Sequence, residues 1–196
     1  MKSIVLVGLP SAAALIAVGL FASSRRGPSS ARFLLQPIES DRIDRYIDRE
    51  ASFSLTVIYD YPDPPSQVFR ALLDDRFMSW MPFTQGVNYA DGARRDVGTL
   101  RALRNSFAVV AERIVLHEPD RLLGVTAAAI SVPLVLESAC TLYELQADGR
   151  GGTRLTWRVG GTPKWFGRKP LRLASMILRP AASWQIGRLR SIIASS

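Results

Sequence analysis

The sequence predicts an α+β domain in which a curved antiparallel sheet of seven strands is covered by one long C-terminal helix. Three observations lead to this prediction. Segments with strand composition follow one another through most of the chain, their connectors are short and rich in turn-forming residues, and apolar residues recur at helical spacing mainly near the C-terminus. Strands joined by short connectors pair antiparallel, and a twisted sheet of seven strands tends to curl.

The first strand is followed by two predicted short helices. Residues 52–59 alternate between apolar and polar side chains, which is typical of a half-buried strand, and the prolines in residues 60–65 end it. Residues 66–74 are predicted to form a helix, since prolines precede it and its apolar residues fall on one face. Residues 77–83 are rich in aromatic side chains and are predicted to form a second short helix that Pro82 ends.

The rest of the domain is predicted as six strands and the long helix. The six segments with strand composition are residues 87–90, 98–104, 106–116, 121–129, 132–145 and 153–159. Their connectors carry Asp, Gly and Pro, which favour turns. After residues 160–161 the apolar residues recur at helical spacing to the C-terminus, and Pro180 is expected to kink this helix or divide it in two.

The folded domain is predicted over residues 51–196, preceded by two other segments. Residues 1–24 contain an uncharged apolar run that reaches the roughly 20 residues needed to cross a bilayer, so they are predicted to be a membrane anchor. A secretory signal that is cleaved off is the alternative. Residues 25–50 are predicted to be a linker in which Arg42, Ile43, Tyr46 and Ile47 can form a short amphipathic helix. The expected location is therefore the membrane, with a slight preference for a cytoplasmic domain.

Positive charge is concentrated at the C-terminus. The chain has a net charge of +8, and the residues after Pro163 include seven cations and no acid. A basic helix can meet anionic lipid headgroups, nucleic acid or an acidic protein, or it can present an ordinary solvated face. Beside a predicted anchor, lipid headgroups are favoured and no nucleic acid is expected. The predicted membrane-surface residues are Arg168, Lys169, Arg172 and Arg179.

The composition excludes several kinds of site. Cys140 is the only cysteine and His117 the only histidine, so neither an intramolecular disulfide nor a His/Cys metal centre can form. The glycines of residues 149–152 lie in a predicted hairpin turn and not between a strand and a helix, so they do not make a phosphate-binding loop. We therefore expect no metal and no cofactor, and we interpret His117 as a solvated turn residue. The sequence does not indicate an oligomeric state.

Several stretches resemble the START-like, or SRPBCC, superfamily, which includes birch-allergen-type, lipid-transport and polyketide cyclase/dehydrase proteins. The matching stretches are PPSQVFRALLDDRFMSW, DVGTLRALR, AERIVLHEPDRL and DGRGGTRLTWRV, in the order that the superfamily has them. The resemblance covers about residues 52–195. It implies a helix-grip fold with a deep cavity for a lipid, sterol, quinone or polyketide. It does not imply one reaction, because the superfamily includes both carriers and enzymes.

The strand register predicts which side chains face such a cavity. If residue 145 lies opposite residue 153, alternation places Glu137, Thr141 and Tyr143 on the same face as Trp157. A carboxylate aimed at an apolar cavity must be paired, protonated or in contact with a polar ligand group, which makes Glu137 a candidate site residue. The alternatives are a solvated strand end or an ion pair with an arginine such as Arg101. A register slip of one residue would reverse the faces.

We expect a carrier or sensor that is tethered to the membrane and binds a hydrophobic molecule such as a lipid, quinone or polyketide-like compound. The predicted ligand-binding residues are Trp80, Phe83, Glu137, Thr141, Tyr143 and Trp157. The alternative is a cyclase/dehydrase-type enzyme in which Glu137 or Tyr143 moves protons. A non-catalytic role is favoured of the two. A third possibility is a protein-interaction domain whose cavity is filled by side chains.

Overall fold

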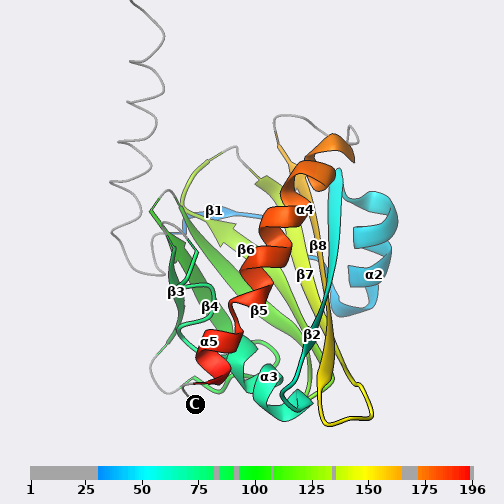
Figure 1. The fold of residues 1–196 in the computed structure, drawn as a ribbon. Coiled ribbons are helices and arrows are strands. Elements are labelled where there is room, and N and C mark those ends of the chain that lie inside the picture. Colours follow the sequence, from blue (N-terminus) through cyan, green and yellow to red (C-terminus); the bar gives the residue numbers. More distant parts are fainter. Residues whose placement is uncertain are drawn as a thin grey trace, which may run out of the picture.

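The structure is a computed structural model of the chain, and it describes residues 31–81, 84–90, 93–106, 108–133, 136–164 and 172–194. Of residues 172–178 and 181 it describes the backbone alone. One sheet dominates the fold (Figure 1). Its strands are β1 (Phe33–Leu34), β2 (Phe53–Tyr61), β3 (Thr84–Tyr89), β4 (Leu100–Asn105), β5 (Val109–Glu118), β6 (Leu122–Ile130), β7 (Leu136–Ala147) and β8 (Thr153–Pro163).

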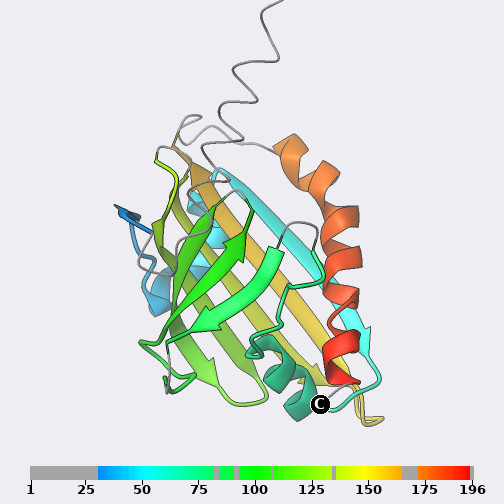
Figure 2. The same ribbon diagram turned by 90° about the vertical axis from the view of Figure 1, so that its left-hand side faces the viewer.

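All neighbouring strands in the sheet are antiparallel. The order is β2-β8-β7-β6-β5-β4-β3. Strands β3 to β8 therefore follow one another across the sheet in sequence order, and β2 lies at the other edge, next to β8. The two-residue strand β1 pairs with the end of β6. The sheet curls around a long C-terminal helix, as the view from the side shows (Figure 2). The predicted fold class, a seven-stranded curved antiparallel sheet with a C-terminal helix, is confirmed.

Helices cover both faces of the sheet. They are η2 (Ser40–Arg42), α2 (Ile43–Arg45), η3 (Tyr46–Glu50), α3 (Pro65–Leu72), α4 (Arg172–Gly187) and α5 (Arg190–Ile193). We call the face covered by α3, α4 and α5 the inner face, and the opposite face, covered by η2, α2 and η3, the outer face. Helix α4 continues through Pro180, and the chain leaves the helix only at residues 188–189, before α5. The expected division at Pro180 is therefore absent.

The second short helix predicted after the first strand is not a helix over its described part. Residues 73–81 form successive turns in which backbone N–H groups donate to carbonyls three residues earlier, as from Phe77 to Asp74 at 3.0 Å and from Met81 to Met78 at 3.0 Å. Met78 has a φ of 63°, in the left-handed region that an α-helix cannot include. The first predicted helix is present as α3, with Pro65 in its first turn.

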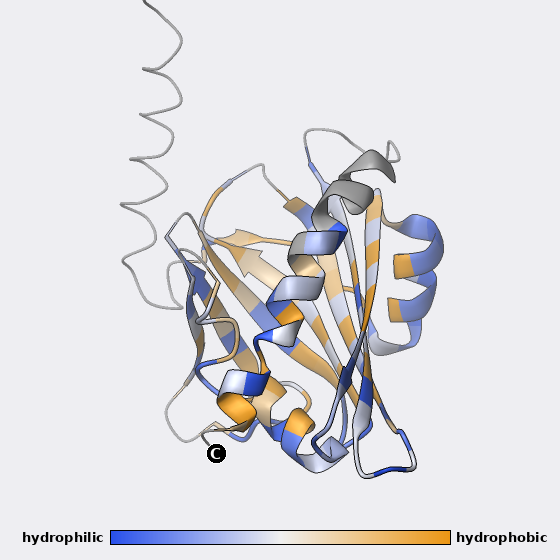
Figure 3. Cartoon of the chain, in the orientation of Figure 1, coloured by the Kyte–Doolittle hydropathy of each residue, from blue (hydrophilic) through white to orange (hydrophobic). Residues whose placement is uncertain are grey.

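The segment predicted as a linker belongs to the folded domain from residue 33 onward. In its helices, the ribbon is coloured hydrophobic on the side toward the sheet and hydrophilic on the side away from it (Figure 3). Ile43 and Ile47 are fully buried there, against Cys140 and Leu142 of β7. The amphipathic pattern around Ile43 is visible in the sequence, but the sequence does not indicate which apolar surface it covers.

Two ion pairs and a close contact at a glycine join residues 44–48 to strand β8. Arg158 of β8 forms ion pairs with Asp44 of α2 and, at 2.7 Å, with Asp48 of η3. Gly160 of β8 lies so close to η3 that a Cβ atom there would be 3.1 Å from Cγ1 of Ile47. The glycine therefore allows helix and strand to approach closely without a shift of Ile47.

The predicted membrane location is contradicted. Within the described ranges, no helix has the length and apolar character that crossing a bilayer requires. Residues 1–24, on which the prediction of an anchor or a signal rested, lie outside the described residues. The same holds for Arg168 and Lys169 among the predicted membrane-surface residues, and only the backbone of Arg172 is described. Arg179 is exposed on α4.

Candidate functional site

Four aromatic rings form a continuous chain on the inner face, and we call them the aromatic chain. Trp80 and Phe77 lie on the turns before β3, Tyr143 on β7 and Trp157 on β8. The Phe77 ring packs edge-on against Trp80 and Tyr143, with centroids 5.8 and 5.9 Å apart. Tyr143 and Trp157 are parallel and offset, 6.2 Å apart. Such geometries are favourable for ring pairs, and they give this part of the inner face flat, polarisable surfaces.

Both ends of the aromatic chain carry a buried hydrogen-bond donor without an acceptor. The indole Nε1 atoms of Trp80 and Trp157 are shielded from solvent, and neither has a hydrogen-bond partner among the described residues. Leaving a buried donor unpaired costs about 1–3 kcal/mol, and native proteins rarely tolerate it. An acceptor that reached these two N–H groups would therefore bind favourably.

A buried ion pair lies beside the aromatic chain. Arg101 of β4 and Glu112 of β5 face each other across the strand pair, and Arg101 Nε lies 2.9 Å from Glu112 Oε2. The Arg101 side chain is 2% exposed and also donates to the backbone oxygen of Leu72 at 3.4 Å. Its guanidinium lies over the Phe77 ring, 5.8 Å from the centroid. A charged pair that is this deeply buried is a polar anchor in a largely apolar region.

Tyr143 links the aromatic chain to this ion pair. Its side chain is fully buried and interacts electrostatically with Arg101. Burial raises the pKa of Tyr143 well above the ordinary value for a tyrosine. The hydroxyl therefore stays protonated at neutral pH and remains a hydrogen-bonding group.

The structure brings together most of the described side chains that the sequence predicted at one site. Trp80, Tyr143 and Trp157 are neighbours in the aromatic chain, and Thr141 lies two residues before Tyr143, on the same face of β7. The register differs from the prediction by two residues, because Leu145 pairs with Leu155 and not with residue 153. A shift of two residues preserves the faces, so the inward orientation was still predicted correctly.

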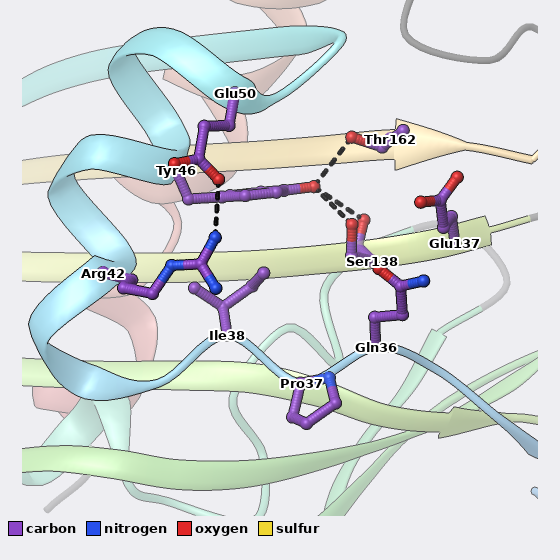
Figure 4. Close-up of a pocket in the computed structure, with 9 residues that line it drawn as sticks. All are labelled: Gln36, Pro37, Ile38, Arg42, Tyr46, Glu50, Glu137, Ser138 and Thr162. Carbon is purple, nitrogen blue, oxygen red and sulfur yellow. Dashed lines mark hydrogen bonds and ion pairs between the residues drawn. The ribbon is translucent and has the colours of Figure 1, made fainter.

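The predicted inward orientation of Glu137 is wrong. The pairing of β7 with β8 is irregular between Leu136 and Ser138, and the extra residue interrupts the alternation of side chains at Glu137. Its side chain lines a pocket on the outer face together with Tyr46 and Ser138 (Figure 4). It does not pair with Arg101 either, since that side chain pairs with Glu112. Phe83, the remaining predicted ligand-binding residue, lies outside the described residues.

Sequence reasoning missed Phe77 and Glu112 as members of the site. A signal for Glu112 existed in the hairpin between the segments 98–104 and 106–116. Because the turn lies near residue 106, antiparallel pairing puts Glu112 opposite Arg101. A basic and an acidic residue that face each other within two largely apolar strands indicate an ion pair.

Comparison with known proteins identifies the family. Residues 52–184 match the family model described as polyketide cyclase / dehydrase and lipid transport. The chain belongs to this family. The START-like, or SRPBCC, superfamily that the sequence resembles is thereby confirmed. A comparison with curated proteins gave no match.

Solved structures with this family's fold are similar to the chain along most of its length. The structure of Ara h 8.0201 is 17% identical, with a TM-score of 0.57, over 74% of this chain and 99% of that one. Protein MLL2253 from Mesorhizobium loti is 16% identical, with a TM-score of 0.55, over 74% and 98%. Major latex-like protein 151 from Panax ginseng is 14% identical, with a TM-score of 0.54, over 73% and 96%. At these identities the likeness concerns the fold.

Proposed function

We propose that the protein binds a hydrophobic small molecule between the inner face of the sheet and helix α4, against the aromatic chain. The observation that carries this proposal is the pair of buried indole N–H groups, on Trp80 and Trp157, that have no acceptor among the described residues. Membership of a family described by polyketide chemistry and lipid transport supports the same class of ligand.

The side chains suggest which hydrophobic molecules bind best. Flat rings pack well on the parallel pair of Tyr143 and Trp157, and burying apolar surface contributes about 25 cal/mol per Å². The two indole N–H donors that have no acceptor among the described residues favour a ligand that carries carbonyl or other acceptor oxygens. A quinone or a polyketide-like compound meets both conditions, whereas a plain hydrocarbon leaves the donors unpaired.

Access to this site requires movement of side chains. Tyr143 is 1% exposed and Trp157 is 7% exposed, so no ligand reaches them directly from solvent. Ile186 and Leu189, at the C-terminal end of the molecule, pack in the same core. Binding is therefore expected to begin with displacement of side chains from α4 or from the turns around Trp80.

Glu137, the first candidate for proton transfer in the enzymatic alternative, does not face the proposed binding site. Glu137 lies on the outer face, and the carboxylate on the inner face, Glu112, is held by Arg101. Tyr143 remains as a candidate, but its raised pKa makes it a poor base at neutral pH. The substitution Tyr143→Phe distinguishes the two functions, because an enzyme loses turnover while a carrier changes in affinity alone.

A matched pair of probes tests the proposed ligand class. 2,3-Dimethyl-1,4-naphthoquinone carries two carbonyl oxygens, and 2,3-dimethylnaphthalene has the same ring system without them. We expect the quinone to bind at least about tenfold more tightly, since it satisfies the indole donors. Affinities can be measured by quenching of tryptophan fluorescence and by native mass spectrometry.

Trp157→Phe keeps an aromatic ring and removes one donor. This substitution should reduce the preference for the quinone, whereas Trp184→Phe, which changes a half-exposed residue on α4, should leave it unaltered. Equal affinity of the wild-type protein for both probes would refute the role of the indole donors. Failure of both probes to bind would refute the proposed function itself.

A further inference from the structure

The outer face carries a small pocket, and we propose that it binds a small organic cation of the primary-amine class. The pocket has a volume of about 80 Å³ and lies where residues 36–50 cross β7 and β8 (Figure 4). It is on the opposite side of the sheet from the aromatic chain. Its lining residues are Gln36, Pro37, Ile38, Arg42, Tyr46, Glu50, Glu137, Ser138 and Thr162.

The inner wall of this outer pocket is a preformed cluster of hydroxyl groups. The Tyr46 hydroxyl lies 2.7 Å from Ser138 Oγ and 2.9 Å from Thr162 Oγ1, and it donates to the backbone oxygen of Ser138 at 3.2 Å. All three residues are at least 95% buried. Because their positions are held by hydrogen bonds and packing, the oxygens on this wall do not have to be ordered when a ligand binds.

Among the described residues, the charged group that lines the pocket without an ion-pair partner is negative. Arg42 is neutralised by Glu50 at 2.9 Å, and Glu50 also pairs with the more exposed Arg45 at 3.0 Å. Glu137 is half-buried and forms no ion pair within the described part of the chain. Figure 4 shows its carboxylate beside Ser138 and Thr162, away from the Arg42–Glu50 pair. A half-buried carboxylate without a counter-charge favours a cationic ligand.

The surroundings have the same sign as Glu137. Residues 36–50 contain five acids and three arginines, a net charge of −2, although the whole chain carries +8. Arg158, which packs under this segment, is already shared between Asp44 and Asp48. This excess of acids within residues 36–50 favours a cation over an anion at the pocket.

The volume of the pocket and the acceptor groups that line it favour a small amine as the ligand. One water molecule needs about 10–15 Å³ of such volume and a drug-sized ligand about 300–1,000 Å³, so 80 Å³ suits a molecule of a few heavy atoms. A primary ammonium group offers three donors. Glu137, the Gln36 amide oxygen and the Thr162 hydroxyl supply acceptors for them. The pocket depends on residues 36–50, which precede the stretch that matches the family.

The test uses the full-length protein and ethylammonium as the probe, with ethanol and acetate as neutral and anionic analogues of similar size. Binding is followed through backbone amide signals in NMR spectra. We expect saturable shifts at Gln36, Ser138 and Thr162 with millimolar ethylammonium, and none that saturate with ethanol or acetate. Equal responses to all three compounds, or no saturable response to ethylammonium, would overturn the proposal.

Two substitutions test the role of the carboxylate. Glu137→Gln is nearly isosteric and should weaken ethylammonium binding at least tenfold. Glu39→Gln removes an exposed acid from the same segment without changing the pocket, so its affinity should stay within twofold of wild type. Unchanged spectra of β5 and β6 would show that Glu137→Gln folds normally. If it does not fold, Glu137→Asp, which withdraws the carboxylate, takes its place, and undiminished binding by the folded variant would contradict the assignment.

Discussion

At the scale of single residues, the features that matter most are polar groups inside apolar surroundings. The inner face holds the indole N–H groups of Trp80 and Trp157, which have no acceptor among the described residues, and the Arg101–Glu112 ion pair. A buried donor without an acceptor reduces stability, and we therefore propose that a ligand supplies the acceptors. Arg101 and Glu112 neutralise each other, and Arg101 also interacts with Tyr143.

The Arg101–Glu112 pair leads to a prediction about stability. Arg101→Met should lower the free energy of unfolding by about 3–5 kcal/mol, because it leaves the Glu112 carboxylate buried without a counter-charge. The double substitution Arg101→Met with Glu112→Leu should recover most of this loss, since neither charge remains. Urea denaturation measures both effects. A single variant within 1 kcal/mol of wild type, or a double variant that is less stable than the single one, would contradict this account.

Residue identity alone predicted the aromatic site but not the orientation of Glu137. The inward position of Trp80, Tyr143 and Trp157 could be predicted because bulky aromatic side chains, on the strands of a curved sheet or on the turns beside them, need an apolar interior. Glu137 was assigned to the wrong face because a bulge depends on how two strands meet, and nothing in the residues near position 137 marks the extra residue.

At the scale of elements, the sequence predicted regular strands well and irregular segments poorly. Alternating side chains and short connectors fix the strands and their antiparallel order, and the register error of two residues between β7 and β8 preserved the predicted faces of Thr141, Tyr143 and Trp157. The turns around Met78 were predicted as a helix, because an aromatic-rich stretch has the same composition in either form. Residues 33–50 were taken for a linker, since their partner surface lies on strands more than seventy residues further along the chain.

The integration of residues 33–50 into the domain is testable by substitution. Ile43 is 0% exposed in the outer cluster, so Ile43→Ala should destabilise the protein by about 2–5 kcal/mol. Ile58 on the edge strand β2 is 59% exposed, and Ile58→Ala should change stability by no more than about 0.5 kcal/mol. Thermal unfolding of the two variants compares them directly. Equal stability of both would mean that this segment behaves as a linker after all.

At the scale of the whole molecule, one curled sheet separates two sites of opposite character. The C-terminal helices close the inner face over aromatic and apolar side chains, and the N-terminal segment closes the outer face over a small polar pocket. Strands β7 and β8 contribute to both sites, with Tyr143 and Trp157 on one side and Ser138 and Thr162 on the other. The family match covers strands β2 to β8, which form the inner face, while the outer pocket depends on a segment that the family match does not include.

The indole N–H signals in NMR spectra test the central claim most directly. The chain has four tryptophans, and each indole gives one signal in a proton–nitrogen correlation spectrum. On saturation with 2,3-dimethyl-1,4-naphthoquinone, we predict that the Trp80 and Trp157 signals move downfield as their N–H groups acquire acceptors, while the signal of Trp184 stays in place. Saturable binding that leaves the Trp80 and Trp157 signals unmoved would contradict the proposed site on the inner face.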